Sequence, residues 1–424
     1  MKEERMNDRF QLVDANQIEH NLIHLKQLVF EVTDACNLRC KYCGYADFYQ
    51  GYDERINKML PFKKAQLIID YLHDLWRKSY VKGTSFPISI SFYGGEPLLN
   101  VPLIKQIISY LESLDFVGKK YFYNMTTNAM LLDKYMDFIV EKDIRLLISL
   151  DGDEEGQSYR VDHTGRNSFS RVIHNIKLLQ EKYPDYFDKL VQFNAVLHNR
   201  NSVEATYRFI KDNFNKSPRI APLNNSGIKD DKKKEFINTY KNVSESLKQA
   251  HNCEALEAEM FISAPDIHQL ANYIFFETNN VYNTYNELFL DKNKLTVFPT
   301  GTCTPFSKKM FITVNGKIIP CERIDHDFAV GFIHDEYIDL NYEYVADRHN
   351  HFVQKYNKQC SVCALYKNCM QCVYQIDDIR TNETKCLSFC PMKSWTHNAT
   401  KQLIYLRKHP GAYQRILNEV SIRS

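Results

Sequence analysis

Three cysteines, Cys36, Cys40 and Cys43, lie in the short segment DACNLRCKYCGY, directly after the apolar run LVFEVT. Three neighbouring thiolates can hold one face of a metal centre, because thiolates bind both zinc and iron–sulfur clusters. A structural zinc site needs four protein ligands, so a distant His or Cys would have to complete it. A four-iron cluster held by three thiolates instead keeps one iron open for an external molecule. The spacing leaves both interpretations open.

Eight further cysteines follow near the C-terminus. Cys303 and Cys321 come first, the run Cys360-x2-Cys363-x5-Cys369-x2-Cys372 follows, and Cys386-x3-Cys390 comes last. Eight thiolates can complete two four-iron clusters with four ligands each. Since C-x2-C pairs are also typical of zinc sites, a pair of structural zinc sites is the alternative. The remaining cysteine, Cys253, stands alone, and we expect it to be a small buried apolar side chain.

Composition restricts the compartment and the class of protein. The chain has 12 cysteines in 424 residues, no apolar N-terminal segment typical of a signal peptide, and no run of about 18 apolar residues. We therefore expect a cytoplasmic chain without a membrane span, in which cysteines bind metal and do not form disulfides. The net charge of +2, from 54 basic and 52 acidic residues, argues against nucleic-acid binding. The hydrophobic content of 44% excludes a disordered chain.

The cysteine triad follows the first of several strand-like runs that alternate with helical patterns. Each run is rich in Ile, Val, Phe or Tyr, and the segments between the runs place apolar residues at i, i+3, i+4 and i+7. This alternation predicts a parallel sheet, either an open partial barrel or a doubly wound fold, with its chemistry at the carboxyl ends of the strands. The predicted strands are 28–33, 87–95, 120–128, 145–152, 189–198 and, more weakly, 219–223.

The rest of the chain changes in character. Residues 231–290 are charged and helical in pattern, and Asn315-Gly316 between apolar runs predicts a β-hairpin. Beyond it the cysteine-rich region shows little periodicity, so metal centres are expected to hold it together. We divide the chain into an N-terminal extension (1–27), a barrel (28–230), a helical connector (231–300), a cysteine-rich domain (301–400) and a C-terminal helix (401–424).

The triad resembles the signature of the radical S-adenosylmethionine (radical SAM) enzymes, C-x3-C-x2-C with an aromatic residue, here Tyr42, before the last Cys. FYGGEP (92–97) is similar to the motif of this family that holds the amino group of SAM. Glycine suits such a site because its bare backbone can approach a ligand closely, and a carboxylate suits an ammonium. The resemblance therefore implies that Gly94, Gly95 and Glu96 bind SAM.

Two further segments carry the same resemblance. TTNA (126–129) implies that Asn128 lies near the SAM ribose, although Ala129 replaces the usual Gly. SLDG (149–152) and YRVD (159–162) imply that Ser149 and Asp151 line the SAM site. By the same resemblance Arg160 would pair with the SAM carboxylate through two parallel hydrogen bonds.

The C-terminal cysteines resemble the SPASM extension of radical SAM enzymes, which carries two auxiliary clusters. The whole chain would then be an α/β protein, a partial (β/α)6 TIM-type barrel with a C-terminal cysteine-rich, hairpin-containing iron–sulfur domain. It would bind SAM and three [4Fe-4S] clusters, one at SAM and two auxiliary. By analogy the second auxiliary cluster takes Cys360, Cys363, Cys369 and Cys386. The first auxiliary cluster takes Cys303, Cys321 and Cys372, with Cys390 as the candidate fourth ligand. The spacing does not distinguish the roles of Cys386 and Cys390. The x2 spacing before Cys372, where the family has x3, leaves its register open.

Glu322 directly follows Cys321 and occupies a position where the related sulfatase maturases have a catalytic Asp, so it is a candidate base. We predict a maturase that installs a thioether or carbon–carbon cross-link in a ribosomally synthesised peptide, in a groove that the 27 Tyr and 26 Phe could line. The alternatives are an anaerobic sulfatase-maturating, formylglycine-forming enzyme and a non-catalytic zinc-binding interaction module. The expected partners are a peptide or protein substrate and a reductant such as flavodoxin or ferredoxin. The 35 residues before Cys36 are too few for a winged-helix leader-binding domain, so leader recognition would need a separate leader-binding protein or another surface of this chain.

Overall fold

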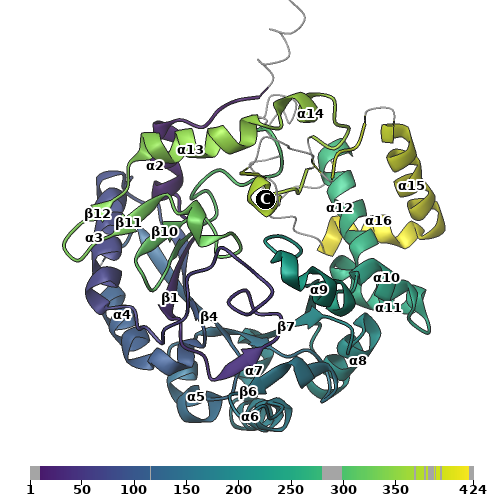
Figure 1. Ribbon diagram of the computed structural model, residues 1–424, viewed down its shortest axis with the longest axis horizontal. Coiled ribbons are helices and arrows are strands. Elements are labelled where there is room, and N and C mark those ends of the chain that lie inside the picture. The colour runs from purple at the N-terminus through teal and green to yellow at the C-terminus, as the bar shows by residue number, and fades with distance from the viewer. Residues whose placement is uncertain are drawn as a thin grey trace, which may run out of the picture. The chain divides into compact units, whose positions relative to one another are not determined.

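The computed structural model describes residues 10–114, 116–278, 298–366, 369–376, 379–380, 386, 388–391 and 394–419 (Figure 1). Packing divides the chain into two compact units. The larger unit comprises Asp14–Asn242 and Cys303–Arg348, and the smaller unit comprises the described parts of 1–13, 243–302 and 349–424. The domain boundaries drawn from the sequence stay a prediction.

The larger unit is built on a parallel sheet. Its six parallel strands, in spatial order, are β1 (Gln27–Thr33), β3 (Phe86–Gly94), β4 (Lys119–Thr127), β5 (Arg145–Ser149), β7 (Val191–Leu197) and β8 (Arg219–Pro222). Each pairs with the next in parallel register. These are the six strands that the sequence predicts, and the predicted partial β/α barrel is confirmed. The carboxyl ends of all six strands therefore share one edge of the sheet, where the sequence motifs also lie.

Amphipathic helices connect these strands and cover the outer face of the sheet (Figure 1). In all of them except the short α7, residues at helical spacing are buried, as Val101, Ile104, Ile108 and Leu111 illustrate for α4. The helices are α3 (Phe62–Lys78), α4 (Val101–Ser113), α5 (Leu132–Glu141), α6 (Phe169–Lys182), α7 (Pro184–Leu190) and α8 (Val203–Phe214).

The predicted hairpin is present, and it extends the barrel sheet. Strands β9 (Lys309–Ile312) and β10 (Lys317–Ile319) are joined by a turn at Gly316, whose φ of +91° suits glycine. Strand β9 pairs in parallel with β1, with Gln27 opposite Lys309. Two short strands, β11 (Gly331–Ile333) and β12 (Ile338–Asp339), continue the sheet in antiparallel pairing, so that it reaches ten strands. The strand that ends just before Cys321, β10, thus belongs to the same sheet as β1, the strand before Cys36.

Glu31 is a buried acidic residue that joins β1 to this hairpin. Its side chain is on β1 and only 1% exposed. One carboxylate oxygen accepts a hydrogen bond of 2.8 Å from the backbone N–H of Val314 in the β9–β10 turn, and the other accepts from the Tyr45 hydroxyl. Burial raises the pKa of Glu31 above its ordinary value, because a charged carboxylate is poorly solvated there. The two hydrogen bonds compensate part of that desolvation cost.

The smaller unit is mainly helical in its described part. It contains α10 (Val243–Lys248), α11 (Cys253–Met260), α12 (Pro265–Thr278), α14 (Asn357–Ser361), α15 (Trp395–Lys408) and α16 (Pro410–Glu419), while α13 (Tyr342–Gln354) runs across the division between the units. Near the C-terminus two helices replace the single predicted one, because Pro410 lacks the N–H that would continue α15. The part of the predicted helical connector between 279 and 297 lies outside the described residues. None of the described helices is both long and apolar enough to cross a membrane.

Replacing Glu31 with Gln should weaken the contact between β1 and the hairpin. The amide would present an N–H₂ donor where the carboxylate now accepts from two donors, so one buried donor would lose its partner. We expect the free energy of unfolding to fall by about 1–3 kcal/mol in chemical denaturation. The exposed Glu54 is the control, because Glu54→Gln should change stability by less than about 0.5 kcal/mol. Equal effects of the two substitutions would contradict this account.

Candidate active site

The three cysteines of the triad lie just beyond the carboxyl end of β1. A short ribbon holds them, formed by β2 (Leu38–Cys40) and β6 (Arg160–Asp162), with Cys40 directly opposite Arg160. The backbone N–H of Lys41 donates to the carbonyl of Tyr159 at 3.1 Å and extends this pairing. The cysteine loop is therefore positioned by the segment that follows β5, which is distant in sequence.

Each thiol of the triad has an N–H donor beside it. The Sγ of Cys36 lies 3.5 Å from the backbone N of Leu38 and 3.8 Å from the Asn128 amide nitrogen. Arg160 Nη1 lies 3.9 Å from Cys40 Sγ, and Arg55 Nη2 lies 3.4 Å from Cys43 Sγ. Such donors stabilise sulfur that carries negative charge, as in a metal-bound thiolate.

Burial raises the pKa of Cys36 to about 11 and that of Cys40 to about 12. Without a metal these thiols are therefore protonated near neutral pH, and metal binding has to displace the protons. Within the described residues, no three His, Cys, Asp or Glu side chains converge on a point that could hold a single metal ion. A four-iron cluster needs no such convergence, because each thiolate binds a different iron. The Nε of Arg55 in this region is also buried and has no hydrogen-bond partner among the described residues. These N–H donors around three thiols fit an iron–sulfur cluster.

Gly94 and Gly95, at the end of β3, pack against the backbone that leads into the triad. Gly94 has a φ of +144°, and a Cβ added to it would lie 2.2 Å from the Thr33 carbonyl oxygen. A Cβ on Gly95 would lie 2.0 Å from the Ala35 carbonyl oxygen. The N–H of Gly95 donates to Thr33 and that of Glu96 to Ala35, both at 2.8 Å. Besides allowing a ligand to approach, these two glycines therefore allow close packing against the cysteine loop, because any side chain here would displace that loop.

Glu96 links the loops that follow β3 and β4. It is buried and accepts hydrogen bonds from the Thr127 hydroxyl at 2.7 Å and from the backbone N–H of Asn128 at 2.8 Å. Burial raises its pKa to about 7. The side-chain amide of Asn128 donates in turn to Asn37 inside the triad loop at 2.7 Å. Ala129 adopts a φ of +61°, which favours glycine and explains why the family usually has Gly at this position.

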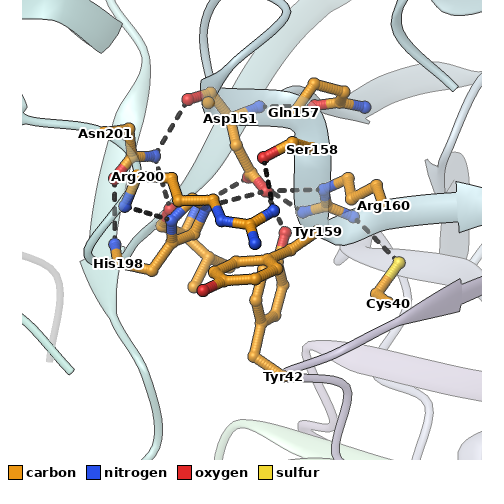
Figure 2. Close-up of polar contacts among 12 residues, drawn as sticks. Cys40, Tyr42, Asp151, Gln157, Ser158, Tyr159, Arg160, His198, Arg200 and Asn201 are labelled. Atoms are coloured by element: carbon orange, nitrogen blue, oxygen red, sulfur yellow. Dashed lines mark hydrogen bonds and ion pairs between the residues drawn. The ribbon is translucent and has the colours of Figure 1, made fainter. Parts of the chain in front are cut away.

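A buried network centred on Asp151 lies beside Cys40, which Arg160 joins to it (Figure 2). Asp151 accepts from Arg160 Nε at 2.8 Å and from Arg160 Nη2 at 3.0 Å, and it also accepts from the Tyr42 hydroxyl. All three side chains are at most 8% exposed. Although burial raises the pKa of Asp151, the charge of Arg160 outweighs this and holds the pKa well below its usual range. Asp151 is thus the residue to which Arg160 makes two parallel hydrogen bonds in this structure, and Nη1 points toward Cys40.

His198 belongs to the same network and lies outside the sequence motifs described above. Its ring stacks on Tyr42 with centroids 5.5 Å apart, and its Nδ1 accepts from the backbone N–H of Arg200 at 3.2 Å. The proton is therefore on Nε2, which lies 3.9 Å from the Asp151 carboxylate. One sequence feature could have indicated His198, because it directly follows a strand that ends at the mouth of the barrel. Ser149, by contrast, donates to Asn194 on β7 at 3.2 Å.

A polar pocket opens beside this network, where β5 and β7 end. Its volume is about 280 Å³. Asp151, Arg200, Asn201 and Lys241 are among its lining residues. Because both acidic and basic groups line it, the pocket suits a small polar molecule.

In the smaller unit four cysteines lie close enough together to interact electrostatically. They are Cys360, Cys363, Cys369 and Cys386, the four that the resemblance predicts to hold one auxiliary cluster. The backbone N–H of Cys390 donates to Cys363 Sγ at 3.5 Å, and Asn398 donates to Cys390 Sγ at 3.3 Å.

The cysteines of the other predicted auxiliary cluster are divided between the two units. Cys303 and Cys321 belong to the larger unit, and Cys372 and Cys390 belong to the smaller unit. Cys253 is half-buried at the start of α11. All these metal-binding roles stay predictions.

Glu322 is not a freely solvated carboxylate. It forms an ion pair with Lys309 on β9 at 2.8 Å, and its other oxygen lies 3.6 Å from Cys321 Sγ. Burial raises its pKa, but the attraction of Lys309 outweighs this, and the net pKa is lowered. A carboxylate held in this way is a weaker base than an unpaired one.

Comparison with known families assigns this fold and site to a class. Residues 30–210 match the radical SAM superfamily. This match begins within β1 and ends within α8, and it includes the cysteine triad, Gly94 to Glu96 and the network of Asp151. Residues 30–210 are therefore a radical SAM domain, and the chain resembles enzymes of that superfamily.

Its relatives have more than one activity. A cysteine-type anaerobic sulfatase-maturating enzyme of Clostridium perfringens strain 13 is 24% identical over 81% of this chain and 87% of its own length. The radical SAM cyclopropyl synthase TigE of Paramaledivibacter caminithermalis is 26% identical over 41% of this chain and 35% of its own length. An uncharacterized protein of Methanocaldococcus jannaschii is 35% identical, and the alignment spans 49% of that protein. The chain thus spans half or less of the length of some relatives and most of the length of others.

Solved structures agree on the fold. The structure of anSMEcpe with bound AdoMet and the Cp18Cys peptide aligns with a TM-score of 0.60 at 17% identity, over 93% of this chain and 99% of that chain. At this identity the likeness shows a shared fold, and it extends beyond the residues of the radical SAM match.

Replacing Asp151 with Asn should be strongly destabilising. The substitution keeps the shape but leaves the Arg160 guanidinium buried without a counter-charge. We expect the free energy of unfolding to fall by about 3–5 kcal/mol in chemical denaturation of the metal-free chain. The control is Glu154→Gln on the same loop, where the side chain is exposed. A loss no larger than that of the control would show that the ion pair does not stabilise this loop.

Proposed function

We propose that this chain is a radical SAM maturase that oxidatively modifies a ribosomally synthesised peptide, forming a thioether or carbon–carbon cross-link. The observation that carries the proposal is the second set of gathered cysteines, Cys360, Cys363, Cys369 and Cys386, in addition to the triad of the barrel. Forming a cross-link removes two hydrogens and two electrons from the substrate. An auxiliary cluster is a suitable acceptor for the electron that remains after hydrogen-atom abstraction.

In this proposal the residues of the chain hold and orient the reactants. Cys36, Cys40 and Cys43 hold a four-iron cluster, which together with SAM supplies a radical able to abstract hydrogen from carbon. Glu96 presents a buried acceptor for the SAM ammonium, and Asn128 lies next to it in the adjacent loop. Arg160 is oriented by Asp151, and its remaining N–H groups are donors for an anionic group. A reductant, flavodoxin or ferredoxin, completes the proposed system, and either a separate protein or another surface of this chain recognises the leader of the peptide.

A second candidate function is the oxidation of Cys or Ser to formylglycine in a sulfatase. The alignment with the Clostridium perfringens enzyme over 81% of this chain favours it. The ion pair between Glu322 and Lys309 counts against it, because a catalytic base at this position should not be neutralised by a neighbouring cation. This leaves the peptide cross-link as the better-supported proposal.

Metal analysis tests the iron–sulfur assignment against a zinc-binding module. We expect about 12 iron atoms per chain after anaerobic reconstitution, four for each of three clusters. The triple variant C36A/C40A/C43A should lose about four of them and keep the rest. Two or three zinc atoms per chain and no iron would favour the interaction module instead.

Mass spectrometry tests the reaction itself. The reduced, reconstituted enzyme, SAM and a short peptide encoded beside its gene should give a product lighter by two hydrogen atoms, together with 5′-deoxyadenosine. A peptide containing C-x-P-x-R should stay free of aldehyde, as judged with a hydrazide reagent. Aldehyde formation on that peptide, with no change in any neighbouring peptide, would replace the first proposal with the second. The triple cysteine variant is the control for both assays.

A further inference from the structure

Arg55 contacts the candidate cluster site and has no role in the family motifs described above. It lies in the loop between Cys43 and α3. Its Nη2 donates to Cys43 Sγ at 3.4 Å, and its Nε is buried without a hydrogen-bond partner. One edge of the guanidinium thus donates to a thiol of the triad, and a second donor in the same plane has no acceptor among the residues that the structure describes.

Neighbouring groups hold Arg55 in this position from two directions. Its guanidinium carbon lies 4.2 Å from the centre of the Tyr45 ring, a cation–π contact. The Tyr45 hydroxyl donates to Glu31, which also accepts from Val314 in the hairpin. The position of the Arg55 side chain is therefore tied to the point where the hairpin joins β1.

The backbone after Arg55 is fixed by Asp34, a buried residue two positions before Cys36. The carboxylate of Asp34 accepts from the N–H of Ile56 at 3.1 Å and from the N–H of Lys58 at 2.6 Å. The segment of Arg55 and the cysteine loop are thus fastened to each other. A side chain held by an aromatic ring, a carboxylate relay and a fixed backbone is preorganised.

We propose that Arg55 is an outer-sphere positioning residue of the cluster, and that its guanidinium raises the reduction potential of the cluster through the Cys43 thiolate. The inference rests on the proposed four-iron cluster at Cys36, Cys40 and Cys43. Reduction adds one negative charge to a cluster. A fixed positive charge and an N–H donor on a ligating sulfur stabilise the reduced form more than the oxidised form. The unpartnered Nε is a further donor, suited to an inorganic sulfide.

The test is a redox titration of the reconstituted enzyme, followed by electron paramagnetic resonance. The signal of the SAM-binding cluster is the part that disappears in the C36A/C40A/C43A variant. In Arg55→Gln we expect the ratio of reduced to oxidised cluster at a given potential to fall about tenfold, equivalent to a midpoint about 59 mV lower for one electron. Arg39→Gln is the matched control, because Arg39 lies on β2 between Cys36 and Cys40, near the same cluster site, but its side chain is exposed. This control should change the ratio by less than about twofold, since solvent and salt screen an exposed charge.

The outcomes separate this inference from the proposed function. If the triple cysteine variant keeps every signal of the wild type, the cluster assignment itself fails. If the signal depends on the triad but Arg55→Gln leaves its midpoint unchanged, or shifts it no more than Arg39→Gln does, only the role of Arg55 fails. If the Arg55→Gln variant cannot be reconstituted with the cluster, the midpoint of the Arg55→Lys variant is measured instead. Lysine keeps the charge without the planar fork, so we expect a midpoint measurably below that of the wild type, and a wild-type midpoint would overturn the inference.

Discussion

The buried ion pair between Asp151 and Arg160 is the interaction on which the geometry of the site depends. It connects the end of β5 to β6, and β6 pairs with the strand that contains Cys40. Removing both charges from water is costly, so the pair is stable only while its hydrogen bonds are complete. Tyr42 and the backbone of Val196 supply the remaining donors to the carboxylate. The cysteine loop is therefore held in place by a network that tolerates little displacement.

A second constraint is the close packing of backbone against backbone where β1 and β3 end. Gly94 and Gly95 allow the loop after β3 to hydrogen bond directly to the residues before Cys36. Glu96 then carries the connection to the loop after β4. Successive loops at the mouth of the barrel thus support one another, as preorganised binding of a small cofactor requires.

The β9–β10 hairpin connects the strand before the triad, β1, to the segment that contains Cys321, because β9 pairs with β1. Because β9 extends the barrel sheet beside β1, Cys321 and Glu322 are part of the larger unit. Glu31 and Tyr45 link this hairpin to Arg55 and hence to Cys43. Glu31 and Tyr45 therefore have a structural role, because they hold the charged side chain of Arg55 next to the triad. The hairpin also explains why Glu322, paired with Lys309, differs from an unpaired catalytic carboxylate.

The amino-acid sequence by itself determined the six parallel strands, the hairpin turn and the radical SAM motifs, because periodicity and cysteine spacing are local properties of the chain. It also grouped Cys360, Cys363, Cys369 and Cys386, which the structure brings together. Only the tertiary structure decided that the hairpin joins the barrel sheet, that Asp151 is the partner of Arg160, and that Arg55 and His198 belong to the site. These are contacts between residues far apart in the sequence or between side chains in irregular loops. No periodic pattern records such contacts, since packing and burial select them only when the chain is folded.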